Sequence, residues 1–225
     1  MNSKTVLLLN SSILVKKDLF RRRNISIQWG KQRIDQHILG YKELNRFKIF
    51  ELFENVIFTD NTIRSENKIP REIKKMLPKD AIIRIRNKND VGVLNKGAGL
   101  IENLVFCSEQ IKQFEYIVYY EPRLLLTDPS FFEDVVEQTQ NTFFSQKGYE
   151  LYRTGHFIAK TTDLLNFISS QDTDYLIKNK ITIEYEFYNF FKPLNPKEVE
   201  YSICKRNTGY KFKLDINDNN SYEDY

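Results

Sequence analysis

Two glutamates stand among five aromatic residues in the stretch IEYEFYNFF, residues 183–191. Aromatic rings can stack on sugar rings. Apolar surroundings also desolvate a nearby carboxylate, which raises its pKa and its basicity. Such a carboxylate can take a proton from a hydroxyl group as a general base. We expect Glu186 to fill this role ahead of Glu184, because it lies deeper in the aromatic run. The alternative is that both glutamates form the solvated face of an amphipathic strand, with phenylalanines in the core.

A third candidate base is His156, in the stretch RTGHFIAK. A lone histidine is more often a packing or hydrogen-bonding residue, and that reading stays open here. The other histidine of the chain is His37, and two histidines are too few for a histidine-rich metal centre. No GxSxG, HExxH or paired-cysteine motif is present, and Cys107 and Cys204 show no metal-ligand spacing.

A carboxylate and a guanidinium follow the strand-like run YIVYY as Glu121-Pro122-Arg123. The guanidinium is a planar fork of donors that suits a phosphate or a pair of sugar hydroxyls. The alternative is a salt bridge from Arg123 to Glu121 or Asp128 at the edge of a sheet. Further upstream, Gly97-Ala98-Gly99 is a GxG motif, which by itself is a weak signal of phosphate binding and could simply shape a helix entry.

These residues are connected by a regular alternation of strand and helix patterns. Apolar runs of strand length predict strands at 5–10, 55–60, 81–87 and 115–120, and helical spacing predicts helices at 31–53, 69–77 and 97–113. Such alternation predicts an α/β fold with an open, mostly parallel twisted sheet and helices on both faces. Beyond residue 140 the pattern is less regular, with strands expected at 141–146 and 157–161 and a helix at 162–170 capped by Thr162 or Asp163. The run 183–191 fits a helix or a strand.

Polar residues follow each of the four predicted parallel strands. Ligands of open α/β sheets bind beyond the carboxyl ends of the strands, so these residues outline a candidate site. They are Asn10-Ser11-Ser12, Asp60-Asn61-Thr62, Arg86-Asn87 and Glu121-Pro122-Arg123. The first of these loops has no glycine, so neither a dinucleotide fingerprint nor a Walker loop is present.

Composition narrows the class of protein. The chain has 225 residues, of which 41% are hydrophobic, and one domain with a full core is the simplest expectation. No apolar run approaches the roughly 20 residues that cross a membrane, and the two cysteines fit a reducing, cytoplasmic setting. The net charge is +4, with basic residues too scattered to predict nucleic-acid binding. The basic run KKDLFRRR, residues 16–23, fits a solvated face, an anion contact or peripheral association with the inner face of a membrane.

The order of these motifs resembles a known family across roughly residues 4–190. The first strand ends in NSSI, and Gln32-Arg33 follow on a helix. The second strand ends in Asp60-Asn61-Thr62. NKGAGLIENL, YIVYYEPRLLL and TGHFIAKTTDLLNFI then come in turn. Together they look like a nucleotide-sugar glycosyltransferase of the GT-A type, similar to transferases of bacterial surface glycans such as capsule and lipopolysaccharide that lack a full Asp-x-Asp motif.

The resemblance implies a role for each matching residue. The residues of the donor site would be Asn10, Ser11, Ser12, Arg33, Asp60, Asn61, Asn95, Lys96, Gly97 and Glu121. Among them, Asp60 would hydrogen-bond the base or ribose, and Gly97 would let backbone approach the sugar diphosphate. The candidate catalytic residues would be Glu186, Glu184, His156 and Arg123.

The resemblance also implies the reaction and its partners. The donor would be a nucleotide sugar, with a UDP-sugar as the first expectation, and the acceptor a glycan or a lipid-linked hydroxyl. Many GT-A enzymes hold a divalent cation with Asp-x-Asp where this chain has Glu121-Pro122-Arg123, so we expect no metal, with Mn²⁺ or Mg²⁺ left open. The alternatives are a catalytically silent nucleotide-sugar-binding module and a nucleotidyltransferase, whose glycine-rich first loop is missing here. Residues 1–125 would form the donor half, 126–215 the acceptor half, and 216–225 a frayed tail.

Overall fold

The structure is a computed structural model that describes residues 4–14, 27–126, 129–135, 140–145, 148–200 and 212–213. Four features singled out in the sequence lie outside these residues: the basic run 16–23, Asp128, Cys204 and the acidic tail 216–225. No helix among the described residues is long and apolar enough to cross a membrane.

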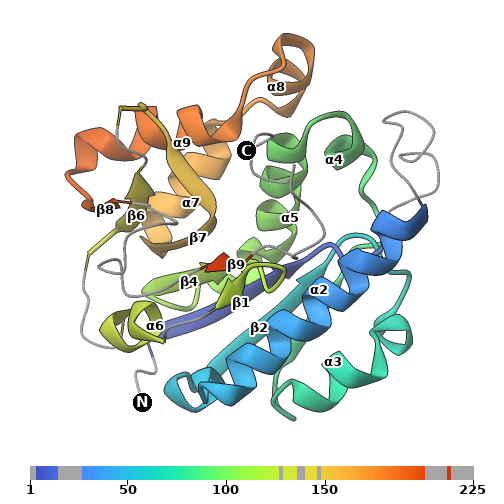
Figure 1. Ribbon diagram of the computed structural model, residues 1–225. Coiled ribbons are helices and arrows are strands. Elements are labelled where there is room, and N and C mark those ends of the chain that lie inside the picture. Colours follow the sequence, from blue (N-terminus) through green and yellow to red (C-terminus); the bar gives the residue numbers. More distant parts are fainter. Residues whose placement is uncertain are drawn as a thin grey trace.

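The described residues form one large sheet, whose seven strands follow the order β3-β2-β1-β4-β7-β6-β8 (Figure 1). The strands β1 to β4 are mutually parallel, β7 runs antiparallel to both β4 and β6, and β8 is parallel to β6. The prediction of an open, mostly parallel sheet is confirmed. In sheet order the bounds are Ile82–Ile85, Asn55–Asp60, Thr5–Ser11, Tyr116–Tyr120, Tyr152–Lys160, Thr142–Ser145 and Lys197–Glu200. A short ribbon pairs β5 (Leu125–Leu126) with β9 (Phe212–Lys213).

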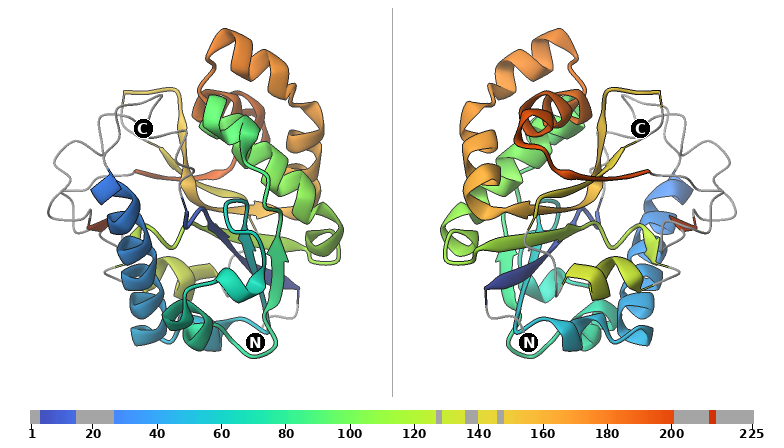
Figure 2. Two further views of the ribbon diagram at one scale, coloured as in Figure 1. Left: turned by 90° about the vertical axis from the view of Figure 1, so that its right-hand side faces the viewer. Right: turned by 90° about the vertical axis from the view of Figure 1, so that its left-hand side faces the viewer.

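Helices cover both faces of the sheet, as Figure 2 shows from two sides. One face carries α2 (Ile27–Arg46), α3 (Arg71–Met76) and α6 (Ser130–Val135). The other carries α5 (Lys96–Ile111), α7 (Thr161–Ser170) and α9 (Ile183–Phe191). The shorter helices are α4 (Asp90–Leu94), α8 (Thr173–Asn179) and the 3₁₀ turns η1 (Ile49–Leu52), η2 (Glu66–Lys68) and η3 (Lys192–Leu194).

The strand β1 lies inside the sheet, between β2 and β4, and this position explains why its sequence is apolar without interruption. Alternate residues of a strand point to opposite faces, and here both faces are covered. Leu7 and Leu9 belong to the core under α2, whereas Val6 and Leu8 belong to the core under α5 and α7. All four side chains are fully buried.

Several local predictions were wrong at element ends. The helix predicted over 31–53 ends at Arg46, because Lys48 adopts left-handed backbone with φ 57° before the turn η1. Neither Thr162 nor Asp163 caps α7, whose N-cap residue is Lys160 without a side-chain cap; Asp163 instead accepts a hydrogen bond from Asn141 at 2.8 Å. The run 183–191, left open between helix and strand, is the helix α9.

Candidate functional site at the carboxyl ends of the strands

The carboxyl ends of the four parallel strands meet at one edge of the sheet. The register aligns Ser11 of β1 with Asp60 of β2, and Asp60 with Ile85 of β3. The ladder between β1 and β4 ends on Leu9 and Tyr120. The loops that follow these strands are therefore neighbours, and the polar residues predicted to outline a site are brought to the same edge.

Asp60 joins the first two of these loops. Its Oδ2 atom accepts the backbone N–H of Ile13 at 2.9 Å, which lies in the loop after β1. Its Oδ1 atom accepts the backbone N–H groups of Thr62 and Ile63 and the hydroxyl of Thr62, at 2.6 to 2.9 Å. Burial raises the pKa of Asp60, and these hydrogen bonds oppose that shift. The carboxylate is fully buried, and its hydrogen bonds hold both loops in place.

A second set of hydrogen bonds links residues that were predicted to bind the nucleotide-sugar donor. The hydroxyl of Ser12 donates to Oδ1 of Asn61 at 3.0 Å, and Nδ2 of Asn61 donates to Asn89 at 3.2 Å. Arg33 of α2 donates from Nε to the carbonyl oxygen of Ser12. Ser11 is buried instead, with its hydroxyl 3.1 Å from that of Tyr41. Ser12, Asn61 and Arg33 are thus brought together, whereas Ser11 anchors β1 to α2.

Asn10 belongs to a hydrogen-bonded chain that crosses the sheet to Glu121. Thr59 donates to Asn103 of α5 at 3.2 Å, and Asn103 donates to Oδ1 of Asn10. Asn10 in turn donates to the hydroxyl of Tyr119, which lies 3.5 Å from Oε1 of Glu121. Sequence reasoning missed Asn103 and Tyr119. The signal for Asn103 was an amide on the otherwise apolar buried face of a helix, where it is 2% exposed.

Glu121 and Arg123 form the ion pair that was considered as an alternative for Arg123, with 3.4 Å between Nη2 and Oε2. Both side chains keep some exposure, at 25% and 18%. The turn between them is held on both sides: Glu121 donates its N–H to the carbonyl of Gly155, and a Cβ on Gly40 of α2 would lie 1.5 Å from the carbonyl oxygen of Pro122. The pair therefore sits on a fixed turn with its charged ends accessible.

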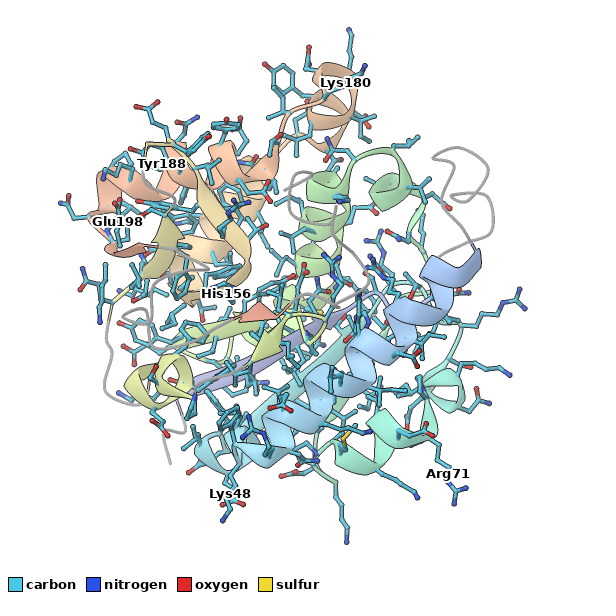
Figure 3. All side chains as sticks on the ribbon, in the orientation of Figure 1. Lys48, Arg71, His156, Lys180, Tyr188 and Glu198 are labelled. Atoms are coloured by element: carbon cyan, nitrogen blue, oxygen red, sulfur yellow. The ribbon has the colours of Figure 1, made fainter. Side chains whose placement is uncertain are left out.

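His156 of β7 and Glu184 of α9 lie on opposite sides of the strand β7. His156 lies in the interior of the protein (Figure 3), where it is 2% exposed, and its ring packs against those of Phe131 and Phe144. Burial, helped by the charge of Arg153, lowers the pKa of His156 to about 3. An imidazole with so low a pKa is a weak base, so the packing interpretation of His156 fits the structure better.

Glu184 faces the strand ends from the first turn of α9. It accepts a hydrogen bond from the hydroxyl of Thr154 at 3.1 Å. Burial raises the pKa of Glu184; the bond from Thr154 and the charge of Arg153 lower it, and the charge of Glu121 raises it further. Since α9 is a helix, the side chain of Glu186 is rotated by about 200° around the helix axis from that of Glu184. The two glutamates therefore lie on different faces of α9.

An irregularity in β7 places Thr154 and His156 on different faces. Residues two apart in a regular strand share a face. Here Thr142 of β6 pairs with Ile158, but Phe144 pairs with Arg153, so the register shifts between them. This β-bulge turns Thr154 toward α9 while His156 stays on the side of α6.

The glycines at the start of α5 make room for other helices. A Cβ on Gly97 would lie 2.5 Å from Cβ of Ile183, and one on Gly99 would lie 2.5 Å from Cα of Gly92 in α4. Asn95 caps α5 by accepting the N–H of Ala98 at 3.0 Å. Its Nδ2 donates to the carbonyls of Leu176 and Ile181, at 3.1 and 3.0 Å. Asn95 and Gly97 therefore fix the start of α9, where Glu184 lies, and the exposed Lys96 stands beside them.

The arrangement combines three charged groups within one edge of the sheet: the carboxylates of Glu121 and Glu184 and the guanidinium of Arg123. Within the described parts of the chain, no group of three or more His, Cys, Asp or Glu residues could hold a metal ion. Chemically, the edge offers a carboxyl with enhanced proton affinity and a cation able to face a phosphate.

No protein-family model matches the sequence, and no curated protein matches it. Among solved structures, the chain is similar to a protein described as a nucleotide-diphospho-sugar transferase from Desulfovibrio desulfuricans G20, with 7% identity, a TM-score of 0.50, and 89% of this chain and 80% of that chain covered. It is also similar to a cytidylyltransferase from Leptospira borgpetersenii serovar Hardjo-bovis, with 16% identity, a TM-score of 0.54, and 96% and 84% covered. At identities this low, the structural similarity shows the fold alone. That fold is GT-A-like, as predicted.

Proposed function

We propose that the protein is a glycosyltransferase that moves a sugar from a nucleotide sugar to a hydroxyl group of an acceptor. In this reaction the acceptor oxygen loses its proton to a base and bonds to the anomeric carbon, while the bond from that carbon to the diphosphate oxygen breaks. The observation that carries the proposal is that Glu184 and Glu121 contact neighbouring residues of β7: Thr154 donates its hydroxyl to Glu184, and Glu121 donates its N–H to Gly155. Arg123 pairs with Glu121, so we propose Glu184 as the base and Arg123 as the cation that faces the leaving group.

Glu184 is the base in this proposal, in place of Glu186, which was preferred from the sequence. Burial raises the pKa of Glu184, so its carboxylate binds a proton more strongly than an exposed one. The base works only when ionised, so turnover should rise with pH through the raised pKa of Glu184. Glu186 belongs to another face of α9, away from Thr154 and the strand ends.

Arg123 neutralises the diphosphate as it leaves. Negative charge develops on the leaving group in the transition state, and a positioned cation lowers the barrier most when it faces that charge. The ion pair with Glu121 orients the guanidinium before the donor arrives. With this cation in place, the proposed reaction needs no divalent metal, although Glu121 is a ligand type that Mn²⁺ or Mg²⁺ accepts.

The donor would lie across the loops after β1 and β2. Hydrogen bonds link Ser12 to Asn61 and to Arg33, and Asn10 reaches the same edge through its bond to Tyr119. A UDP-sugar as donor and a glycan or lipid-linked acceptor of a bacterial surface polysaccharide are the finer parts of the proposal. They rest on the resemblance seen in the sequence.

A nucleotidyltransferase is the second candidate, since the Leptospira cytidylyltransferase has a similar fold. That class cradles phosphates with the backbone of a glycine-rich loop after the first strand. In this chain the loop has no glycine, and the N–H groups of Ile13 and Leu14 are already donated to side chains of Asp60 and Thr62, at 2.9 Å each. The glycosyltransferase is therefore favoured over it.

The test compares Glu184→Gln with Glu186→Gln in a transfer assay that measures release of nucleoside diphosphate. Loss of a general base lowers turnover by roughly 10²–10⁴-fold. We expect that loss for Glu184→Gln with donor affinity retained, and near-normal turnover for Glu186→Gln. Equal, near-normal turnover for both variants would show that neither carboxylate is the base. Absence of turnover in the wild type, with nucleotide sugar bound, would support the silent module.

A further inference from the structure

A strongly basic surface follows β2 in the chain and takes no part in the proposed reaction. We name it the α3 basic surface, and it comprises residues 64–79, which include η2 and α3. The segment has two acidic residues, Glu66 and Glu72, and six basic ones: Arg64, Lys68, Arg71, Lys74, Lys75 and Lys79. Its net charge of +4 equals that of the whole 225-residue chain, so the remaining sequence is balanced.

The six basic side chains are all exposed, and several surround a hollow in the surface. The hollow has a volume of about 400 Å³ and is lined by Asn67, Ile69, Arg71, Lys74 and Lys75. Glu66 pairs with Lys74 at 2.7 Å, so one of the two acids of the segment is engaged with a cation at the rim. The hollow thus presents amide and cationic donors to an anion.

The chemistry of this surface favours phosphate groups that are displayed side by side. Single-stranded nucleic acids are held by aromatic stacking as well as charge, and residues 64–79 contain no aromatic residue. Clusters of about four to eight lysines and arginines are typical of surfaces that contact anionic lipid headgroups.

We propose that the α3 basic surface docks the protein on a membrane that contains anionic phospholipids, with headgroup phosphates at the hollow. Each basic residue near such a surface strengthens binding by about fivefold, and the effect is screened by salt. The proposal does not depend on which reaction the strand-end site performs.

The experiment measures co-sedimentation with vesicles of phosphatidylcholine containing a minor fraction of phosphatidylglycerol, and with vesicles of phosphatidylcholine alone. The test variant is Arg71→Gln with Lys75→Gln. The matched control is Lys178→Gln with Lys180→Gln, which removes the same charge at α8, and Figure 3 shows Lys180 at the opposite end of the molecule from Arg71. Thermal unfolding of each variant checks that the fold is retained.

The expected result is binding to the anionic vesicles only, weakened by roughly 25-fold in the α3 variant and little changed in the α8 control. Absence of binding by the wild type, or an equal loss in both variants, would overturn the proposal. A third arm offers soluble tripolyphosphate and an RNA oligonucleotide. Saturable binding of either one that needs Arg71 and Lys75, without vesicle binding, would identify a free polyphosphate or a nucleic acid as the partner and would also overturn it.

Discussion

Asp60→Asn removes one acceptor at the point where the loops after β1 and β2 meet. In the native protein Oδ2 of Asp60 accepts the N–H of Ile13, and Oδ1 accepts three donors from Thr62 and Ile63. Asparagine keeps one acceptor oxygen, but its NH₂ group faces the N–H of Ile13, so that a donor meets a donor. We expect the loop after β1 to separate from the loop after β2.

The size of the effect follows from the number of groups left without a partner. A buried polar group that loses its hydrogen bond costs about 1–3 kcal/mol, and here two groups are affected, the N–H of Ile13 and the new NH₂. The expected loss in the free energy of unfolding is therefore about 2–6 kcal/mol, out of a typical total of about 5–15 kcal/mol. The control Asp80→Asn changes an exposed side chain and should stay within about 0.5 kcal/mol of the wild type.

Urea unfolding followed by circular dichroism measures both variants. The reasoning is refuted if Asp60→Asn unfolds at the same urea concentration as Asp80→Asn. The more drastic Asp60→Ala separates two roles of the residue. A variant that stays as stable as the wild type and loses only nucleotide binding would favour a direct contact of Asp60 with the nucleotide.

Three further predictions concern the charges and the packing of the site. Arg123→Ala should lower turnover by about 10²–10³-fold, as expected when a group that stabilises transition-state charge is removed. The wild type should keep its activity in a chelator, and a loss that Mn²⁺ or Mg²⁺ restores would contradict this. Gly97→Ala should destabilise the fold by about 1–3 kcal/mol and lower turnover, because its Cβ would displace Ile183 and with it Glu184. Stability and turnover equal to those of the wild type would refute the packing argument.

The order of strands and helices was predictable because strongly periodic segments dominate the first half of the chain. The four parallel strands, α5 and the polar strand ends all followed from apolar run lengths and helical spacing. The ends of elements were less predictable. The left-handed backbone at Lys48 ends the pattern of α2 although the apolar spacing continues through Ile49 and Phe53.

The candidate site was only partly predictable, because its geometry depends on contacts between distant segments. The resemblance implied that the backbone of Gly97 approaches the diphosphate, but nothing in the sequence indicated that Ile183, a residue far along the chain, packs against Gly97. The choice between Glu184 and Glu186 depended on whether residues 183–191 form a helix. The bulge that separates Thr154 from His156 has one signal in the sequence, Gly155, because an isolated glycine within a strand often marks a bulge.

The central claim is that the strand-end site binds a nucleotide sugar and transfers its sugar to a hydroxyl. Phosphorus NMR of the wild-type protein tests this directly, in one sample with nucleotide sugars and glycan acceptors and in a second with nucleoside triphosphates and sugar 1-phosphates. The account predicts nucleoside diphosphate in the first sample, lost in Glu184→Gln, and no pyrophosphate in the second. Pyrophosphate in the second sample, with no nucleoside diphosphate in the first, would contradict the account and identify a nucleotidyltransferase.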